Sequence, residues 1–527
     1  MSGGEVNIKS IRALEEQIRE HEMAIIELKR TRNSLLNVSK LPPEVLGDIF
    51  HWNVALRDDF DELDKRSHNF LFVCHHWLEV ALQTPEIWSF WGDTPKEWAR
   101  WYPRSGTAPL DLVLGDHYHG DSHFDTTLCD VLRDRATQDT IRRVHLKAND
   151  PELLNAIISS ISATCEGIQS SSVESFILCS WKHNRGDSSL VDVSNFFAHY
   201  CFPKLQQLEL LDCTISSWNH LTSRTTALTT LDLNLKHPSP TPTTSQLLSI
   251  LASNPALRTV VLANRAIPDD SGDGSSSQIQ LHHLKRLQLK GDLRHVTGLL
   301  HRLAYPRIMD SLCIVLYDCA IADISQSIGP CLRDYLQRRG RSQSGLGLGV
   351  SLSSEGGIRF HVRDVGGIDL SAPAPARMKS LAFIGINTGQ ALPKDVMGKL
   401  TLDLIAHVPR EEFVYFKACE QPVAMEDVSA RFPNLKALHS LGTPLPAIFP
   451  TSNLDMDGDI FPSLQHVCLD SVVVKDDDWS PLTTFLARRS SSGNPLHSLG
   501  IAGRYCMRPE VLKSIRSMVR QFRMNGT

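Results

Sequence analysis

Several features that define large classes of proteins are missing from this sequence. Its net charge is only −5, from 54 basic and 59 acidic residues, so it lacks the basic excess with which nucleic-acid-binding proteins neutralise phosphates. No apolar stretch approaches the roughly 18 residues of a membrane-spanning helix. Small and charged residues follow Met1, in place of the apolar core of a secretory signal peptide. We therefore expect an intracellular protein, cytoplasmic or nuclear, that binds neither nucleic acid nor membrane.

Motifs that carry catalysis or hold cofactors are also missing. The 12 cysteines are scattered and never spaced Cys-x-x-Cys, which argues against a zinc site or a redox dithiol. There is no P-loop and no Gly-x-Ser-x-Gly elbow. The densest histidine cluster, His117, His119 and His123, has no cysteine nearby and is interrupted by Gly120, so we interpret it as a polar loop. We expect no enzymatic activity, no metal and no cofactor.

Three weaker patterns do not change that expectation. Cys74 precedes two histidines, but adjacent residues of a helix point in different directions, which disfavours a thiol–base pair. The segments 269–280 and 455–466 begin like calcium-binding loops, but neither ends in the required glutamate. We interpret both as polar turns.

What is present is a globular composition, with 42% hydrophobic and 21% charged residues. A length of 527 residues corresponds to about three or four domains of ordinary size, or to one long repeat array. The order of patterns along the chain favours an array preceded by two small segments.

The first segment is helical. Residues 8–36 contain no glycine or proline, and a heptad pattern of mostly apolar residues runs through them. The predicted seam consists of Ile11, Leu14, Ile18, His21, Ile25, Leu28, Arg32 and Leu35. Two interpretations remain open: a coiled coil through which two copies of the chain associate, or a single amphipathic helix that folds back on the domain behind it or stays partly exposed.

The second segment contains short apolar helices and most of the tryptophan. A helix is predicted after Pro42 and Pro43, because proline is favoured at the first helical position. A second apolar helix is predicted for residues 70–82. Six of the nine tryptophans lie between Trp52 and Trp101. Such large aromatic surfaces need a packed core or a partner to cover them.

From about residue 138 a Leu-x-x-Leu-x-Leu pattern repeats, mostly every 22–32 residues, as in leucine-rich repeats. The predicted strands begin at Ile141, Val173, Leu205, Leu228, Leu257, Leu284, Leu312, Leu381, Phe413, Leu435, Leu464 and Leu496. An interval of 69 residues holds a degenerate repeat at 358–362. Helices are predicted between strands, for example at 246–252, 296–304, 328–338, 396–407 and 481–489, and a last helix at 509–522 closes the array.

Segments rich in Gly, Ser, Thr or Pro mark loops inserted near 237–245, 268–278 and 341–357. The variable strand positions, such as Glu209, Asp232 and Gln288, should lie on the concave face of the solenoid, and acidic and neutral residues outnumber basic ones there. The fold class expected is mixed α and α/β: an amphipathic helix or coiled coil over 1–38, a small all-helical domain with its Trp-rich flank over 39–110, and an α/β solenoid over 111–527.

The segment from Leu41 to Trp88 resembles the F-box. That motif begins Leu-Pro-x-Glu, continues into an apolar helix, and carries Val-Cys-x-x-Trp in a later helix. The chain has Leu41, Pro42 and Glu44, and then Val73, Cys74 and Trp77. With the preceding coil and the repeats that follow, it is similar to fungal F-box-like proteins with degenerate leucine-rich repeats. The chain departs from the motif in its 31 positions between Pro42 and Val73, some eight to ten more than is typical, and in His75 after the cysteine.

The resemblance implies a protein without an active site of its own. An F-box binds a Skp-type adaptor and through it a cullin, and the repeats hold a protein substrate, whose identity the sequence does not reveal. The chain would then be the substrate-recognition subunit of a cullin-type (SCF-like) ubiquitin ligase. The alternative is a repeat scaffold without ligase attachment that self-associates through residues 8–36. The adaptor-binding residues implied are Leu41, Pro42, Pro43, Leu46, Ile49, Phe50, Val73, Cys74 and Trp77; each could instead belong to the core of a small helical domain.

Overall fold

The structure is a computed structural model of the chain. It describes residues 3–55, 69–91, 102–114, 130, 132, 140–148, 151–163, 172–180, 191–199, 201–235, 240–269, 278–306, 309–317, 321–339, 346–352, 358–364, 379–387, 394–410, 413–419, 424–450, 460–472, 474, 478–503 and 507–525. These residues divide into two compact units, Met1–Cys213 and Thr214–Thr527. The boundary between the units falls inside the segment 111–527 that the sequence suggested as one array.

Unit 1 begins with the long helix α1 (Gly3–Ser34), followed by a short 3-10 turn, η1 (Asn37–Lys40). The helix occupies the predicted segment. Every residue of the predicted seam is exposed along its length, from Ile11 to Leu35. The seam is therefore not packed on the domain behind it, and both an exposed single helix and a coiled coil between two copies remain open.

Four short helical segments follow and form what we call the helical cluster: α2 (Pro43–Ala55), η3 (Asn69–Phe72), α3 (His75–Gln83) and α4 (Pro85–Trp88). The single helix predicted for residues 70–82 is in fact two elements, because Cys74 adopts an extended conformation and caps α3. The cluster has its own core, in which the Phe50 ring stacks on that of Phe70 at 4.5 Å. The indole of the buried Trp88 donates a 2.8 Å hydrogen bond to the carbonyl of Ala81.

The rest of unit 1 is a parallel sheet with helices between its strands. The elements are β1 (Phe90–Trp91), η4 (Tyr102–Ser105), β2 (Leu110–Leu114), β3 (Ile141–Ala148), α7 (Pro151–Ala163), β4 (Ser175–Ser180), α8 (Ser194–His199) and β5 (Gln207–Leu211). Neighbours pair in parallel in the order β1-β2-β3-β4-β5. The predicted strands that begin near Ile141, Val173 and Leu205 are β3, β4 and β5.

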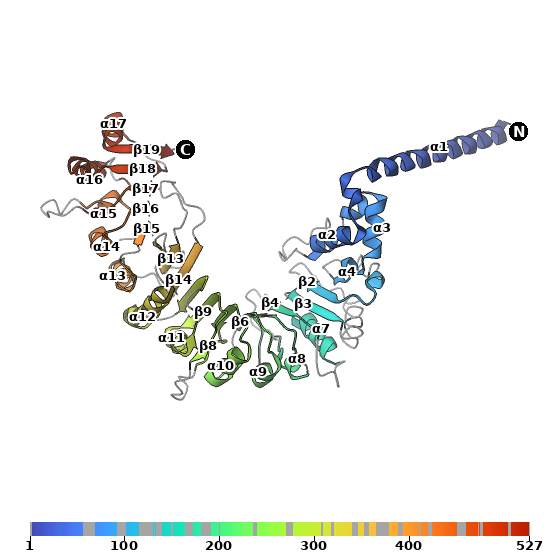
Figure 1. The fold of residues 1–527 in the computed structure, drawn as a ribbon, viewed down its shortest axis with the longest axis horizontal. Coiled ribbons are helices and arrows are strands. Elements are labelled where there is room, and N and C mark those ends of the chain that lie inside the picture. Colours follow the sequence, from blue (N-terminus) through green and yellow to red (C-terminus); the bar gives the residue numbers. More distant parts are fainter. Residues whose placement is uncertain are drawn as a thin grey trace. The chain divides into compact units, whose positions relative to one another are not determined.

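Unit 2 continues with strands and helices that alternate along the chain (Figure 1). Its first elements are α9 (Asn219–Arg224), β6 (Thr230–Leu235), α10 (Thr244–Ser253), β7 (Thr259–Asn264), β8 (Ile279–Gln280), β9 (Arg286–Asp292), α11 (Leu293–Arg302), β10 (Leu303–Ala304), β11 (Ser311–Tyr317) and α12 (Ile321–Arg339). Strands β6, β7, β9 and β11 pair in parallel in that order, and β8 and β10 form a separate short pair.

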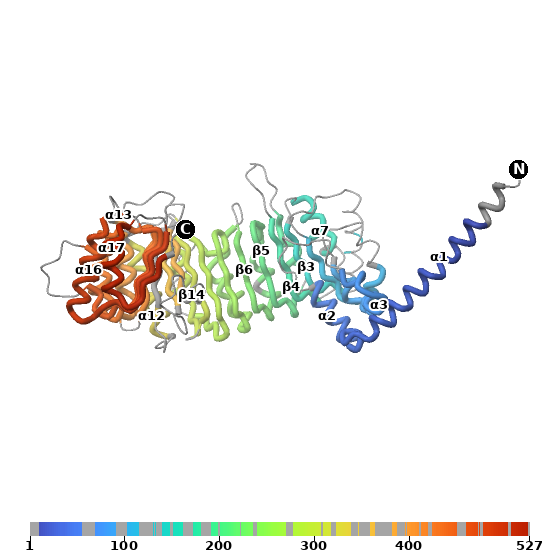
Figure 2. Tube along the Cα trace, turned by 90° about the horizontal axis from the view of Figure 1, so that it is seen from above, coloured from blue at the N-terminus to red at the C-terminus, as the bar shows by residue number. Residues whose placement is uncertain are grey.

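The second half of unit 2 contains β12 (Leu346–Leu352), β13 (Ile358–Asp364), β14 (Lys379–Asn387), α13 (Lys394–Ile405), β15 (Phe413–Cys419), α14 (Met425–Arg431), β16 (Ala437–Leu441), α15 (Leu445–Ile448), β17 (His466–Asp470), α16 (Ser480–Ser491), β18 (Leu496–Ala502), α17 (Pro509–Met518) and β19 (Val519–Asn525). The sheet runs β11-β14-β13-β12-β15-β16-β17-β18-β19. One row of strand side chains is buried, and α10 to α17 lie along one side of the strands in Figures 1 and 2.

Three predictions for unit 2 are wrong in detail. In β11 the buried residues are Leu312, Ile314 and Leu316, so the repeat begins at Met309 and not at Leu312. The segment 341–357, predicted as a loop, contains β12, and the residues at 358–362 belong to β13, which is antiparallel to both of its neighbours.

The predicted last helix, residues 509–522, ends at Met518. The residues that follow it form β19, which pairs in parallel with β18. Among the described residues, no helix combines the length and the apolar character that crossing a membrane requires. The fold is therefore mixed α/β, with large, mostly parallel sheets, as expected from the alternation of strand and helix patterns.

Candidate protein-docking surface

Helix α2 has two apolar faces, and only one of them is buried. Leu46, Phe50 and Val54 recur every four residues and lie in the core of the helical cluster. A second stripe lies roughly 130° away around the helix axis, at 100° per residue. It consists of Val45, Ile49 and Trp52, whose exposed fractions are 43%, 48% and 58%. One helix thus holds the cluster together and presents an apolar stripe to solvent.

A second exposed apolar site lies at the junction of η3 and α3. Phe70 and Leu71 are buried in the cluster, whereas the next two residues, Phe72 and Val73, are 85% and 55% exposed. The 3-10 turn produces this division, because it carries Phe72 out of the core one residue before the chain becomes extended at Cys74. We call Val45, Ile49, Trp52, Phe72 and Val73 the apolar surface of the helical cluster.

The residues implied by the F-box resemblance divide into three sets. Pro42, Pro43, Ile49 and Val73 are exposed. Leu41, Cys74 and Trp77 are half-buried, and Trp77 packs on the cluster core, its ring 5.1 Å from that of Phe50. Leu46 and Phe50 are each only 1% exposed, so their side chains support the surface from within.

Three residues of the apolar surface were absent from the sequence-based set: Val45, Trp52 and Phe72. The spacing of Val45, Ile49 and Trp52 at i, i+4 and i+7 marks them as one helical face, which was the available signal. For Phe72 no such signal existed, because its exposure depends on where a 3-10 turn ends.

Exposed apolar side chains are concentrated in this part of the molecule. Among the described residues, all the large hydrophobic side chains that are exposed lie between Ile11 and Val73, except Met524. They fall on α1, on the connection to α2, and on the helical cluster. Concentrations of this kind mark surfaces that a partner covers.

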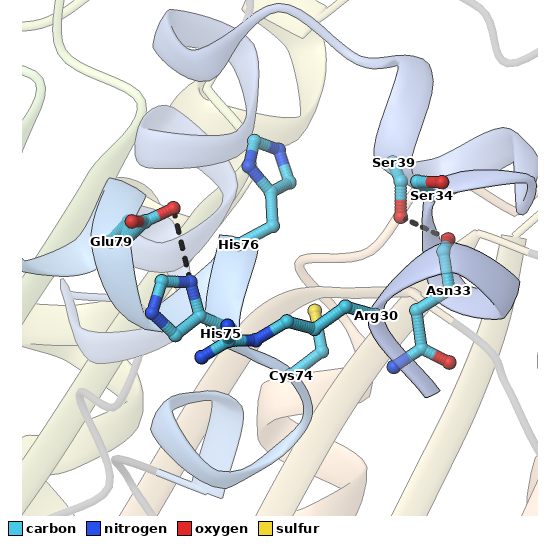
Figure 3. Close-up of a pocket in the computed structure, with 8 residues that line it drawn as sticks. All are labelled: Arg30, Asn33, Ser34, Ser39, Cys74, His75, His76 and Glu79. Carbon is cyan, nitrogen blue, oxygen red and sulfur yellow. Dashed lines mark hydrogen bonds and ion pairs between the residues drawn. The ribbon is translucent and has the colours of Figure 1, made fainter. Parts of the chain in front are cut away.

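A cavity of about 260 Å³ lies where the last turn of α1 meets the start of α3 (Figure 3). Its lining is polar and consists of Arg30, Asn33, Ser34, Ser39, Cys74, His75, His76 and Glu79. His75 pairs with Glu79, Nδ1 to Oε2 at 3.3 Å, one turn along α3. Among the described residues, the Cys74 thiol forms no hydrogen bond with either histidine, so no thiol–imidazole pair of the kind that activates a nucleophile is assembled here.

No group of His, Cys, Asp and Glu side chains within the described ranges is arranged to hold a metal ion. The histidines at 117, 119 and 123 lie outside the described residues, as do the aspartates at 455, 457 and 459. Asp269 is described, and its carboxylate forms an ion pair with Arg265, with 2.9 Å between Nη1 and Oδ2.

Comparison with models of known protein families and with curated protein sequences finds no match to this chain. The geometry of the helical cluster and its exposed apolar residues therefore carry the functional argument.

Proposed function

We propose that the chain is the substrate-recognition subunit of a cullin-type ubiquitin ligase. In this proposal the helical cluster is an F-box that binds a Skp-type adaptor, and the strand–helix repeats are a leucine-rich-repeat-like solenoid that binds a protein substrate. The chain would act by proximity, since it raises the effective concentration of substrate near the ubiquitin-loaded enzyme and stabilises no transition state itself.

The observation that carries this proposal is the second apolar stripe of α2. A helix that only built a small core would bury one stripe and leave the other polar. Here Ile49 and Trp52 are apolar and exposed, and they lie in the segment that carries the Leu-Pro-x-Glu pattern. Pro42, Pro43 and Val73 add exposed side chains at positions that the motif assigns to adaptor contact.

The experiment is co-purification of the full chain with a Skp-type adaptor, using Ile49→Glu/Trp52→Glu as the test variant. Both side chains are exposed, so their replacement leaves the cluster core intact. Aromatic and aliphatic residues at the centre of an interface commonly contribute about 2 kcal/mol each, so we expect the double variant to bind at least about 100-fold more weakly. The matched control is Leu14→Glu/Ile18→Glu, which makes the same kind of change on α1. Failure of the unaltered chain to bind any Skp-type adaptor would sink the proposal.

A second candidate function is a repeat scaffold that self-associates through α1. The specific observation in its favour is the exposed seam, in which Ile11, Leu14, Ile18, Ile25, Leu28 and Leu35 are each at least 49% exposed. An isolated helix with such a seam is typical of a coiled-coil partner, although His21 and Arg32 weaken the seam.

Light scattering separates this candidate from a monomeric chain. The full chain should have twice the monomer mass, and a version that lacks residues 1–38 should be monomeric. The two double variants exchange roles here: Leu14→Glu/Ile18→Glu should abolish the dimer, and Ile49→Glu/Trp52→Glu should leave it unchanged. A monomeric mass for the full chain excludes self-association.

A further inference from the structure

The face of the unit 2 sheet opposite its buried side carries a set of cationic side chains. Strand side chains alternate between the two faces, and in this part of the sheet the buried set is apolar. The opposite set contains Arg286 and Lys290 of β9, Arg359 and Arg363 of β13, and Lys417 of β15. We call these five residues the cationic face.

The strand register brings residues from distant parts of the sequence into neighbouring rows of this face. Lys290 lies opposite Val315, Val315 opposite Gly385, and Gly385 opposite Arg359. In the next row, His361 and Lys417 lie opposite the same residue of β12, Gly349. Lys290 and Arg359 are 69 positions apart in the sequence, but in the sheet only three strand spacings separate them.

Glycines of β12 separate the β13 and β15 residues. Gly347 lies between Arg363 and Tyr415, and Gly349 lies between His361 and Lys417. Glycine has no side chain, so at these two register positions β12 places none between the flanking cations. Two strand spacings make the backbone separation about 10 Å, which one bound carboxylate-bearing chain can bridge.

Little negative charge offsets these cations. Apart from Arg359, no member of the cationic face forms an ion pair with a carboxylate among the described residues. The described carboxylates on this face from β9 to β17 are Asp292 and Asp470, both at strand ends, and that of Asp292 caps α11 by accepting from the Arg294 amide at 2.9 Å. Among the charged side chains described on this part of the face, basic residues therefore outnumber acidic ones.

Two buried nitrogens in this region lack partners. His439 of β16 is only 4% exposed; its Nδ1 is 3.2 Å from the Tyr415 hydroxyl, and its Nε2 is buried without a hydrogen bond. The Nε of Arg363 is likewise buried without a partner. Buried polar atoms of this kind are uncommon and call for an explanation, such as a missing ligand.

Burial and the surrounding positive charges lower the pKa values of two histidines in this region. Burial, and then the charges of Arg363, Arg359 and Lys417, lower the pKa of His361 to about 4. Burial and the charge of Lys417 lower that of His439 to about 4, with Asp470 acting in the opposite direction. The potential on this face is therefore positive at more than one row.

We propose that the cationic face binds an extended acidic segment of a partner protein. From β9 to β15 the face spans five strand spacings, about 24 Å, which corresponds to about seven residues of extended chain. Arginine and lysine at five positions would contact its carboxylates through charge-assisted hydrogen bonds. That this segment belongs to a ubiquitination substrate rests on the proposed function; the binding itself does not.

An acidic peptide fits this face better than a nucleic acid does. The chain carries a net charge of −5, which opposes a polyanion over most of its surface. Single-stranded nucleic acids are also held by aromatic side chains on which their bases stack. On the described part of this face Tyr415 is buried, Tyr317 and Phe383 are half-buried, and the Phe383 ring already packs on His361 at 4.6 Å, which leaves few aromatic faces free for stacking.

The test measures binding of a fluorescein-labelled peptide of about eight glutamates to the full chain by fluorescence anisotropy. The first variant is Arg363→Gln/Lys417→Gln. The second is Arg286→Gln/Arg359→Gln. Both of these arginines are exposed, so we expect this variant to fold as the unaltered chain does. The control is Lys399→Gln/Lys513→Gln, which removes the same charge from exposed positions on α13 and α17.

We expect each cationic-face variant to bind the peptide at least about tenfold more weakly, because each removes two charged contacts. The control should bind as the unaltered chain does. No binding by the unaltered chain, an equal loss in the control, or tighter binding of a labelled oligothymidine than of the peptide would each overturn the proposal. Adaptor binding is measured in a separate experiment. If the chain binds no adaptor, the peptide-binding result still decides whether the cationic face binds acidic segments.

Discussion

At the scale of single residues, the ion pair between Asp111 of β2 and Arg142 of β3 is the best candidate for a stabilising charge interaction in unit 1. The guanidinium donates two hydrogen bonds to the carboxylate, Nε to Oδ1 at 2.9 Å and Nη2 to Oδ2 at 2.6 Å. Asp111 is 2% exposed, and its hydrogen bond is the largest of the causes that raise the pKa of Arg142. The carboxylate of this pair is therefore buried and its guanidinium half-buried, unlike the exposed pairs on the helices.

Removing one partner of that pair should be costly. We expect Arg142→Met to lower the free energy of unfolding by about 3 kcal/mol, because the buried Asp111 carboxylate loses its counter-charge. Urea denaturation followed by circular dichroism measures the change. The control is Arg338→Met, which breaks an exposed pair with Asp334 and should change stability by less than about 1 kcal/mol. Equal effects of the two variants would contradict the argument.

Asn254 has a comparable role in unit 2. It is fully buried at the end of α10, where its side-chain oxygen accepts from the Leu228 amide and its nitrogen donates to the carbonyls of Thr225 and Ile250. Asn254→Ala would leave these backbone groups buried without partners, at a cost of about 2 to 3 kcal/mol. Ser249→Ala, at an exposed position of the same helix, is the control in the same urea titration. A loss below about 0.5 kcal/mol for Asn254→Ala would show that water replaces the side chain.

The lowered pKa of His439 predicts how the stability of the folded chain depends on pH. The ordinary value is 6.5, and in the folded chain it falls to about 4, so the unfolded chain binds the proton more tightly between these values. Stability should therefore decrease as the pH falls from about 7 to about 5, by about 1 kcal/mol from this residue. His439→Gln should reduce the pH dependence of the melting temperature. An unchanged dependence would mean that the pKa of His439 is the same in the folded and the unfolded chain.

At the scale of elements, the packing of α2 against the turn between α3 and α4 depends on Gly47. A Cβ at this position would lie 2.8 Å from Oγ1 of Thr84, whose hydroxyl donates to the Val80 carbonyl. The branched Thr84 side chain has little room to move away. The α2 helix therefore approaches this turn as closely as a glycine allows.

We expect Gly47→Ala to destabilise the chain by about 1 to 2 kcal/mol through this overlap, despite the better helix propensity of alanine. Gly298→Ala in α11 is the matched control, because a Cβ there meets nothing within 4 Å. The control should stabilise by up to about 1 kcal/mol. Thermal unfolding of both variants shows whether each substitution raises or lowers the melting temperature. A stabilised Gly47→Ala would show that α2 and Thr84 move apart without an energetic cost.

The sequence predicted most elements because their periodicity follows from burial. Along each strand of the parallel sheet, a buried leucine alternates with a residue on the opposite face. The positions of these strands could therefore be predicted from the Leu-x-x-Leu-x-Leu pattern alone. Strand β12 was predicted as a loop because of its glycine and serine content, although its apolar residues, Leu346, Leu348, Val350 and Leu352, recur at the period of a strand. For β19, the sequence Val519 to Asn525 continues the amphipathic pattern of α17, and only pairing with β18 makes it a strand.

For the candidate site, the sequence identified the segment but not its outward face. When a helix carries two apolar stripes, as α2 does, the sequence does not tell which one meets the core. Leu46 and Phe50 face Phe70 and Trp88, which come from later elements, and that choice exposes Ile49. The contact partners of α2, rather than its own composition, decide which residues a partner can reach.

At the scale of the whole molecule, the two proposed binding surfaces lie in different units. The exposed apolar residues cluster before residue 74, whereas the cationic face belongs to unit 2. Adaptor binding and acidic-peptide binding should therefore respond to separate sets of substitutions. This separation is what a chain that connects two different partners requires.

The division into two units also makes a prediction about combined substitutions. Arg142 lies in unit 1 and Asn254 in unit 2, and they share no described hydrogen-bond partner. The stability change of Arg142→Met should therefore be the same with and without Asn254→Ala, within about 0.5 kcal/mol, because sites that belong to separate compact units and share no partners act additively. Arg142→Met combined with Asp111→Asn is the contrasting pair, since the two side chains hydrogen-bond directly and the two changes should not add. Urea titrations of the single and double variants give both coupling energies, and a coupling above about 1 kcal/mol between Arg142 and Asn254 would contradict the independence of the two sites.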